Sequence, residues 1–198
     1  FKGALTSDGL PEDEIEMSIG AGNHESLVQV LGKIKNHPEV KSGLIMKLIS
    51  KNYLNLGNPP SLKTCTRDTF KEGLTYTQSD LLRIALSIAS VCVHLHRKGI
   101  NHGDLYAHNI MINEAADCLL GDFGAASFYD INSELAGNIE RVEVRAFGCL
   151  LEDVLGRVIE KDVNVQFYHK WESLIGNCTI SDVKSRLNFS EVLEELNK

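Results

Sequence analysis

The widest apolar stripe in the chain lies between Ser79 and Arg97, where hydrophobic residues recur at the spacing of one helix face. Its apolar members are Leu82, Ile84, Ala85, Ile88, Ala89, Cys92 and Leu95. Thr77 or Ser79 is suited to cap the start of this helix, and Gly99 is suited to end it. The pattern therefore predicts a core helix that leads directly into the polar segment after Gly99.

A shorter helix is predicted near the beginning of the chain. Pro11 suits a first helical turn, and the acidic residues 12–14 suit the positive end of a helix dipole. Ile15 and Ile19 are one turn apart, so we expect them to share the apolar face. Further helical patterns run from Val142 to Leu155, through Trp171 to Ile175, and from Ser190 to Leu196.

Strand patterns occupy the stretches between these helices. Leu27 to Leu31 alternates like a strand, and Gly43 to Ile49 is by pattern alone a buried strand. A loop is marked by Asn58 to Ser61. Residues 110–112 and 118–120 are apolar and are separated by a turn-prone stretch. These two apolar stretches and the turn between them predict a short hairpin.

Three polar residues suited to ATP chemistry flank that hairpin. Asp104 and Asn109 share the loop before it, and Asp122 follows it. The hairpin should therefore carry Asn109 and Asp122 to the same place. A carboxylate can accept the proton of a substrate hydroxyl, and oxygen ligands can hold Mg²⁺ against phosphates. The spacing predicts a site for phosphoryl transfer.

The residues around this site resemble those of the protein-kinase family. HGDLYAHN over residues 102–109 is similar to the H-R-D-L-x-x-x-N catalytic loop, and DFG over residues 122–124 matches the D-F-G motif. EVRAFG over residues 143–148 resembles the family's D-V-W-S-F-G helix, and Arg186 stands where kinases have R-P-x-F. Compact kinases of this kind resemble the bacterial eukaryotic-like serine/threonine kinases.

The resemblance implies an α+β, protein-kinase-like fold with two lobes. Residues 1–49 would form the remainder of an incomplete amino-terminal lobe, from a helix to the hinge. Residues 50–198 would form the mainly helical carboxy-terminal lobe. The chain opens on Phe1 rather than Met, so we expect it to be a fragment, with fusion to further domains upstream as one expectation.

The resemblance also implies a role for each residue of the site. Asp104 would be the catalytic residue that accepts or orients the hydroxyl proton, and Asn109 and Asp122 would hold Mg²⁺. His102 and Phe123 would be packing residues that align the two loops. The residues implied to contact ATP are Met46, Lys47, Leu48, Ile49, Met111 and Glu14, with Met46 as gatekeeper and the next three as the hinge.

The glycine-rich loop and the strand lysine of kinases do not occur in the sequence. Glu14 is the candidate for the glutamate that pairs with this lysine, and Glu16 is the alternative. Fewer residues separate Lys2 from Glu14 than separate the lysine from the glutamate in kinases. The favoured interpretation of Lys2 is therefore an exposed lysine at a strand end. We therefore expect the chain alone to bind ATP weakly.

Other departures affect regulation and substrate docking. Gly103 replaces an arginine that binds a phosphorylated activation loop in many kinases, so switching through that residue is not expected. Tyr106 replaces a lysine that helps to neutralise the transferred phosphoryl group. Glu143 replaces an aspartate that braces the catalytic loop, and its longer side chain can do the same. The short stretch from Gly124 to Glu143 contains no A-P-E, so the peptide-docking platform is short.

Composition narrows the partners. The net charge of −7 disfavours nucleic acid as a partner. No apolar run approaches the roughly 18 residues of a membrane span, so no membrane partner is expected. The scattered cysteines predict free core thiols in a reducing, cytoplasmic compartment. They are Cys65, Cys92, Cys118, Cys149 and Cys178.

The sequence thus predicts a kinase that transfers the ATP γ-phosphate to a Ser/Thr hydroxyl of a protein substrate. Two alternatives remain at this point. H-G-D-L-x-x-x-N also opens the catalytic loop of aminoglycoside and choline phosphotransferases, which would make the acceptor a small molecule. A catalytically impaired pseudokinase scaffold is the other alternative, because the glycine-rich loop and its lysine are missing. No residue separates Ser/Thr from Tyr specificity.

Overall fold

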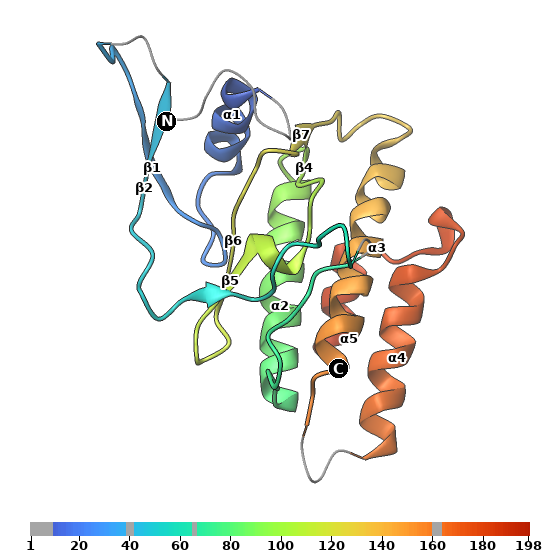
Figure 1. The fold of residues 1–198 in the computed structure, drawn as a ribbon. Helices are drawn as coiled ribbons and strands as arrows, with labels where there is room; N and C mark the ends of the chain where they lie inside the picture. Colours follow the sequence, from blue (N-terminus) through green and yellow to red (C-terminus); the bar gives the residue numbers. More distant parts are fainter. Residues whose placement is uncertain (1–9, 39–41, 65–66, 160–163) are drawn as a thin grey trace.

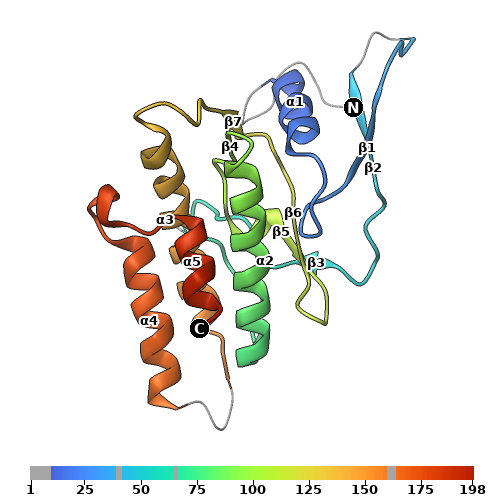
Figure 2. The ribbon, with the colours of Figure 1, turned by 180° about the vertical axis from the view of Figure 1, so that it is seen from behind.

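The computed structural model describes residues 10–38, 42–64, 67–159 and 164–198. Helices dominate the carboxy-terminal part, in which α2 (Gln78–His96), α3 (Ala136–Leu155), α4 (Val165–Thr179) and α5 (Phe189–Leu196) pack together (Figures 1 and 2). The main contacts join α3 to α4 and α2 to α5. The rings of Phe147 and Phe189 meet edge to face at 5.4 Å between centroids, which joins α3 to α5.

Helix α2 is the centre of this core. Thr77 and Asp80 form a capping box at its start, in which each side chain accepts a hydrogen bond from the other residue's backbone N–H. The helix ends at His96, and Gly99 follows with a φ of +66°. The predicted helix, cap and stop are therefore confirmed, with Thr77 rather than Ser79 as the cap.

The expectation that no apolar run could span a membrane is wrong for α2. By length and composition, Gln78–His96 meets the criterion for a membrane-spanning helix. Half of that stretch is buried inside the protein. Several of its side chains are fully enclosed by the other helices and the small sheets, including Leu81, Ile84, Ile88 and Leu95. Packing in the core accounts for the apolar character of α2.

Two small sheets pack against α2. Strands β3 (Leu54–Asn55), β5 (Ile110–Ile112) and β6 (Cys118–Leu120) form one antiparallel sheet in the order β3-β5-β6, which contacts α2 through β6. Strands β4 (Ile100–Asn101) and β7 (Ser127–Phe128) form a second, which contacts α2 through β4. The β5–β6 pair confirms the predicted hairpin, and the short 3₁₀ helix Ala107–Asn109 leads into it.

The amino-terminal part differs from the expected pattern in three places. Helix α1 (Pro11–Ala21) buries Ile15, but Ile19 is 46% exposed, because Met17, Ser18 and Ala21 occupy the buried side instead. Strand β1 covers Val30–Ile34 and not the expected stretch from residue 27, since Leu27 bridges to Leu120 of β6. Strand β2 (Gly43–Met46) is antiparallel to β1 and mostly exposed, so the expected buried strand is wrong.

Figure 1 shows the β1–β2 hairpin extending away from the helical part, with α1 between the hairpin and the β4–β7 pair. Helices α3 and α4 are longer than expected, because α3 begins six residues before Val142 and α4 extends on both sides of residues 171–175. The fold is mixed α and β, as expected for a kinase-like chain with a small first part and a larger helical second part. The lobe boundary at residue 49 stays a prediction.

Candidate active site

The catalytic loop holds Asp104 and Asn109 together. The Asn109 amide nitrogen donates to the Asp104 backbone carbonyl at 2.9 Å and to Asp104 Oδ2 at 2.8 Å. Both partners are acceptors, so the nitrogen of the amide must face Asp104 and its oxygen must point elsewhere. Asn109 is buried and the Asp104 side chain is 36% exposed. The loop therefore presents the Asp104 carboxylate to solvent in a fixed orientation.

A second set of contacts joins this loop to Asp122. The backbone N–H of Gly121 donates to the Asn109 carbonyl at 3.0 Å, next to the β5–β6 pairing. His102 Nε2 lies 2.9 Å from the Gly121 carbonyl, to which it donates, and the His102 ring lies 5.1 Å from that of Phe123. The sequence places Asp122 directly after Gly121. The predicted packing roles of His102 and Phe123 are consistent with these contacts.

Asp122 has an unusual backbone, with a φ of +56°. Its Oδ1 accepts a hydrogen bond of 3.2 Å from the N–H of Gly124, which stabilises a tight turn. This turn leaves Oδ2 of Asp122, together with Oδ1 of Asn109, as oxygen atoms available to a hard cation. Among the described residues, no group of three His, Cys, Asp or Glu side chains could hold a metal. The donor chemistry of Asn109 and Asp122 fits Mg²⁺ that is shared with phosphate oxygens.

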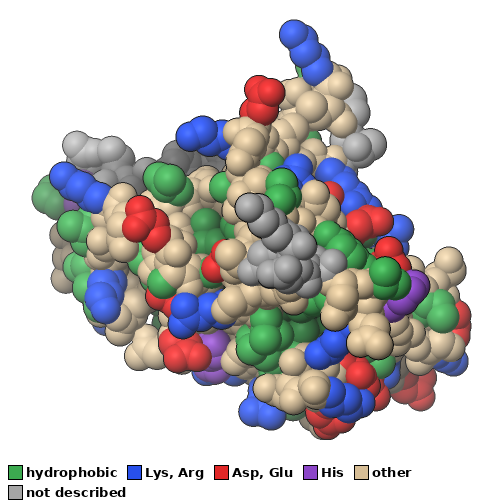
Figure 3. All heavy atoms as spheres, turned by 90° about the horizontal axis from the view of Figure 1, so that it is seen from below, with side chains coloured by type: hydrophobic (Ala, Val, Ile, Leu, Met, Phe, Trp, Pro, Cys, Tyr) green, Lys and Arg blue, Asp and Glu red, His purple; other side chains and the backbone are tan. Residues whose placement is uncertain are grey.

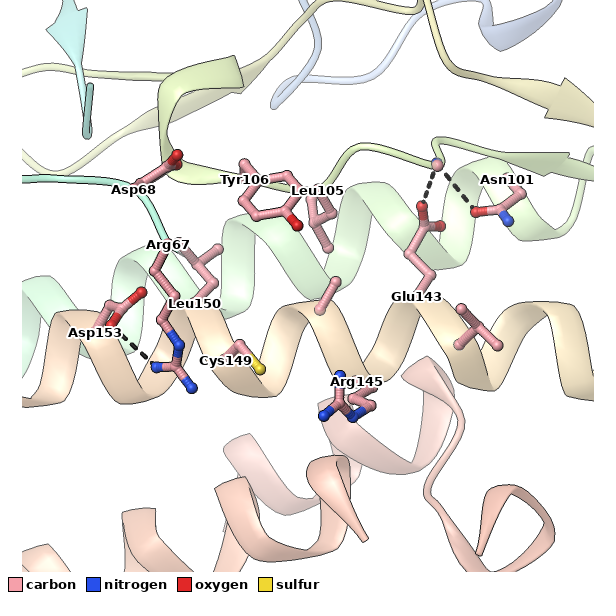
Figure 4. A pocket seen from close by; sticks show the side chains of 14 residues that line it. Arg67, Asp68, Asn101, Leu105, Tyr106, Glu143, Arg145, Cys149, Leu150 and Asp153 are labelled. Carbon is pink, nitrogen blue, oxygen red and sulfur yellow. Dashed lines mark hydrogen bonds and ion pairs between the residues drawn. The ribbon is translucent and has the colours of Figure 1, made fainter. Parts of the chain in front are cut away.

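Glu143 braces the catalytic loop from α3. Its Oε1 accepts from the Gly103 N–H at 2.9 Å (Figure 4), and its Oε2 accepts from His96 Nε2 at 2.7 Å. The side chain is 2% exposed, so both bonds lie away from water. The expectation that glutamate can replace the family's aspartate is consistent with this geometry.

Gly103 is required by the shape of the loop. Its φ is +76°, and a Cβ at this position would lie 2.5 Å from the Ala125 carbonyl oxygen. The segment after Asp122 therefore approaches the catalytic loop more closely than a residue with a Cβ at position 103 would allow. An arginine at position 103 would not fit this backbone without a shift of Ala125.

The segment after Gly124 packs against β4, α3 and α1. Strand β7 pairs with β4, and the Tyr129 N–H donates to the Gly99 carbonyl at 2.8 Å. The Tyr129 hydroxyl donates to Glu140 at 2.9 Å, and burial followed by this carboxylate raises the pKa of Tyr129. On the other side, a Cβ at Gly20 of α1 would lie 3.0 Å from the Phe128 ring. Contacts from β4, Glu140 and α1 thus hold the segment from Ser127 to Tyr129.

Asp68 and His108 were not predicted as site residues. Asp68 Oδ1 lies 2.8 Å from His108 Nδ1, and Oδ2 accepts the His108 backbone N–H at 2.9 Å. His108 stacks on Tyr106 at 5.7 Å, with its Nε2 3.9 Å from Asp104 Oδ2. Asp68 lies 40 residues away in an irregular loop, so no periodicity or local spacing in the sequence indicates this contact.

The predicted hinge lies apart from the catalytic residues. Lys47, Leu48 and Ile49 line a pocket of about 590 Å³, whose other walls are residues 23–25 and 27–29, Ser50, Tyr53 and Leu119. None of Asp104, Asn109 and Asp122 lines it. Met46 ends β2 and is 47% exposed, so it does not occupy the enclosed position expected of a gatekeeper.

The remaining nucleotide candidates lie on two elements. Met111 is half-buried in β5, where it pairs with Leu119 of the hinge pocket. Glu14 is half-buried on α1, whereas Glu16 is exposed, so the structure favours Glu14 of the two. The prediction for Lys2 lies outside the described residues.

Four of the five cysteines are described, and all four are free thiols. Burial raises the pKa of Cys118 to about 12 and that of Cys178 to about 12, and it raises that of Cys92 well above the usual range. The buried thiols are therefore inert packing residues. Cys149 on α3 is half-buried, and Cys65 lies outside the described residues.

A second pocket, of about 480 Å³, lies between the catalytic loop and α3 (Figure 4). Gly103, Leu105 and Tyr106 line it on the loop side, and α3 provides the opposite wall from Val142 to Asp153. Arg67 and Asp68 lie at one end of it. Nothing in the sequence pattern predicted this pocket, because it depends on how the loop before α2 crosses the catalytic loop.

Comparisons with known proteins agree with this geometry. The family model described as "Protein tyrosine and serine/threonine kinase" matches residues 11–146. A probable serine/threonine-protein kinase of Dictyostelium discoideum is 32% identical over 106 residues, which are 52% of this chain and 14% of that protein. L-type lectin-domain containing receptor kinase V.5 of Arabidopsis thaliana is 30% identical over 178 residues, which are 77% of this chain and 25% of that protein.

A shorter match concerns a viral protein. The serine/threonine-protein kinase US3 homolog of varicella-zoster virus is 44% identical over 55 residues, which are 27% of this chain and 14% of that protein. This chain therefore spans a quarter or less of the length of these relatives.

Proposed function

We propose that this chain, which belongs to the protein tyrosine and serine/threonine kinase family, transfers the γ-phosphate of ATP to a serine or threonine hydroxyl of a protein as part of its full-length polypeptide. The observation that carries the proposal is the pair of hydrogen bonds from the Asn109 amide nitrogen to Asp104. These bonds fix the orientation of the Asp104 carboxylate, which would receive the proton, and they leave the amide oxygen of Asn109 as the atom that would bind the metal.

Asp104 would orient the attacking hydroxyl and accept its proton. The hydroxyl oxygen then forms a bond to the γ-phosphorus, the bond from that phosphorus to the bridging β,γ oxygen breaks, and ADP leaves. Asn109 and Asp122 would hold Mg²⁺, which neutralises phosphate charge when it is bound. Glu143 and His102 keep the two loops in register during this step. The protein contributes positioning and electrostatic stabilisation.

Specificity for Ser/Thr is supported by the similar serine/threonine-protein kinases of Dictyostelium discoideum and varicella-zoster virus. A cytoplasmic location is part of the proposal and is supported by the free thiols of the core. A small-molecule acceptor receives no support, since the matching family model is one of protein kinases.

The test is a phosphorylation assay on the full-length natural polypeptide. Radiolabelled ATP, Mg²⁺ and casein are the reactants, and phosphoamino-acid analysis of the product separates serine, threonine and tyrosine. We expect label on serine or threonine that disappears in Asp104→Ala. Label on tyrosine alone contradicts the acceptor class, and label on an aminoglycoside or choline but on no protein contradicts the substrate class. No transfer to any acceptor contradicts the reaction.

A further inference from the structure

Asp68 is a buried carboxylate beside the catalytic loop. Its side chain is 2% exposed, and within the described ranges no lysine or arginine pairs with it. The carboxylates of the surface have a different setting, because acidic and basic side chains are interspersed on the face shown in Figure 3 and neither sign dominates. Burial of a carboxylate is unfavourable unless hydrogen bonds replace its water. The position of Asp68 is therefore maintained by its specific contacts and not by apolar packing.

Arg67 and Asp68 are neighbours in the sequence but point in different directions. Arg67 reaches α3, where it pairs with Glu152 at 2.6 Å and with Asp153 at 3.1 Å. The Asp68 carboxylate instead lies next to the catalytic loop (Figure 4). Because the adjacent guanidinium is committed to α3, the charge of Asp68 acts on the catalytic loop.

Both oxygens of Asp68 are engaged by His108. Oδ2 accepts the backbone N–H at 2.9 Å, and Oδ1 accepts from the ring at 2.8 Å. Within the short 3₁₀ helix, the Asn109 N–H donates to the Tyr106 carbonyl, whereas the His108 N–H donates to Asp68. Donors at the start of a helix lack partners inside it, and Asp68 supplies one from outside. The side chain of Asp68 thus fixes the turn that carries Asn109.

The bond to the ring determines which nitrogen of His108 carries the proton. A carboxylate only accepts, so Nδ1 is the donor and Nε2 of the neutral ring has no proton. Nε2 lies 3.9 Å from Asp104 Oδ2, and the ring is stacked on Tyr106. A nitrogen without a proton cannot donate to Asp104. The Oδ2 atom is therefore left to accept from Asn109 and from an incoming hydroxyl.

We propose that Asp68 is a positioning residue for the phosphoryl transfer and acts through His108. Its bond to the backbone N–H holds the turn that orients the metal ligand Asn109. Its bond to the ring keeps the ring proton on the nitrogen remote from Asp104. The inference rests on the proposed kinase function and assigns a role in it to a residue from outside the catalytic loop.

Two substitutions separate these roles. Asp68→Ala removes both bonds. In Asp68→Asn the amide oxygen still accepts the His108 N–H, so the amide nitrogen faces the ring and donates to Nδ1. This bond moves the ring proton to Nε2, which then donates to Asp104 and competes with the substrate hydroxyl. We therefore expect metal-dependent binding to weaken in Asp68→Ala alone, and turnover to fall in both variants.

Calorimetry measures the binding without requiring catalysis. Mg²⁺–ATP is titrated into the full-length polypeptide at about pH 8, where imidazole is neutral, and ATP with EDTA is the reference. Asp68→Ala should weaken the Mg²⁺-dependent binding about tenfold, as for loss of a group that supports a metal ligand, and Asp68→Asn should leave it unchanged. The fitted stoichiometry corrects for an unfolded fraction. Asp153→Ala is the matched control, because this carboxylate pairs with Arg67 from α3, opposite the catalytic loop.

Kinetics with casein as the acceptor provide the second measurement. Asp68→Asn should lower kcat about tenfold at unchanged KM for ATP. Equal Mg²⁺–ATP affinity of Asp68→Ala and the unmodified protein, or an equal loss in Asp153→Ala, overturns the role at the turn. An unchanged kcat in Asp68→Asn overturns the role at the ring. If the unmodified protein transfers no phosphate, the kinase function is contradicted, while a tenfold loss of affinity in Asp68→Ala, restored in Asp68→Asn, still supports the positioning of Asn109.

Discussion

Asn109 and Leu48 belong to the same predicted nucleotide site, but Asn109 is 8% exposed and Leu48 is 94% exposed. Asn109 bonds to Asp104 and Gly121, which are close in sequence or across a short hairpin. Leu48 follows a two-stranded hairpin that extends from the rest of the molecule. Local contacts thus hold the catalytic loop in place. In contrast, the described part of the chain leaves the predicted hinge, which would contact the nucleotide, largely exposed.

The sharpest test of this contrast is the loss of a metal ligand. We expect Asp122→Asn in the full-length polypeptide to abolish Mg²⁺-dependent ATP binding, because it removes the anionic oxygen that a hard cation prefers. Isothermal titration calorimetry with Mg²⁺–ATP measures the effect. Asp130→Asn is the matched control, since Asp130 also caps a turn by accepting the N–H two residues ahead. Equal affinity of the Asp122→Asn variant and the unmodified protein would exclude Asp122 as the ligand.

The next largest effect concerns the chemical step alone. Asp104→Ala should lower phosphoryl transfer by roughly 10²-fold or more, because a positioned base typically contributes 10²–10⁴-fold. Nucleotide affinity should hardly change, since Asn109 keeps the Asp104 backbone carbonyl as an acceptor. Steady-state kinetics and calorimetry on the same sample separate the two quantities. A parallel loss of affinity would mean that Asp104 takes part in binding.

A matched pair of leucine substitutions compares the two regions directly. Leu120 in β6 is fully buried, so Leu120→Ala should lower the free energy of unfolding by about 2–5 kcal/mol. Leu48→Ala should change it by no more than about 0.5 kcal/mol, because the side chain is almost fully exposed. Denaturant unfolding of residues 1–198 gives both values. A large effect at Leu48 would show that other parts of the chain cover this segment in solution.

The smallest expected effect is a dependence of stability on pH. His24 links the α1–β1 connection to α2, since its Nδ1 accepts from the Ser26 N–H and its Nε2 lies 3.2 Å from Ser90 Oγ. Burial and the nearby His94 lower the pKa of His24 from its ordinary value of 6.5. The unfolded chain therefore takes up this proton first as the pH falls, so stability is present above about pH 6.5 and declines below it.

His24→Asn retains an acceptor for Ser26 but does not titrate in this range. The melting temperature should thus fall less between pH 7.5 and 5.5 in this variant than in the unmodified chain. Differential scanning calorimetry at the two pH values measures the difference. An identical fall in both proteins would mean that other groups account for the whole acid dependence.

The sequence predicted the elements whose signals are local. The capped helix α2, the β5–β6 hairpin and the loop containing Asp104 and Asn109 depend on periodicity, turn residues and short spacing, and each is present in the structure. The bracing by Glu143 followed from its place relative to the catalytic loop in the family's pattern.

Long-range contacts and solvent exposure could not be predicted in the same way. Asp68 reaches His108 across 40 residues, and no periodic pattern encodes such a contact. The run from Gly43 to Ile49 is apolar like a core strand, but apolar composition does not reveal whether another layer covers it. Ile19 has the spacing of a buried residue, yet the direction in which α1 packs turns it toward solvent.

Gly103 limits which residues the catalytic loop can accept at this position. An arginine at this position would place its Cβ against the Ala125 carbonyl. It would also have to adopt a φ of +76°, which residues other than glycine rarely do. The segment from Gly124 to Phe128 would have to move before such a change could be tolerated. A single Gly103→Arg substitution would therefore disturb the contact between the two loops and not simply add a positive charge to the catalytic loop.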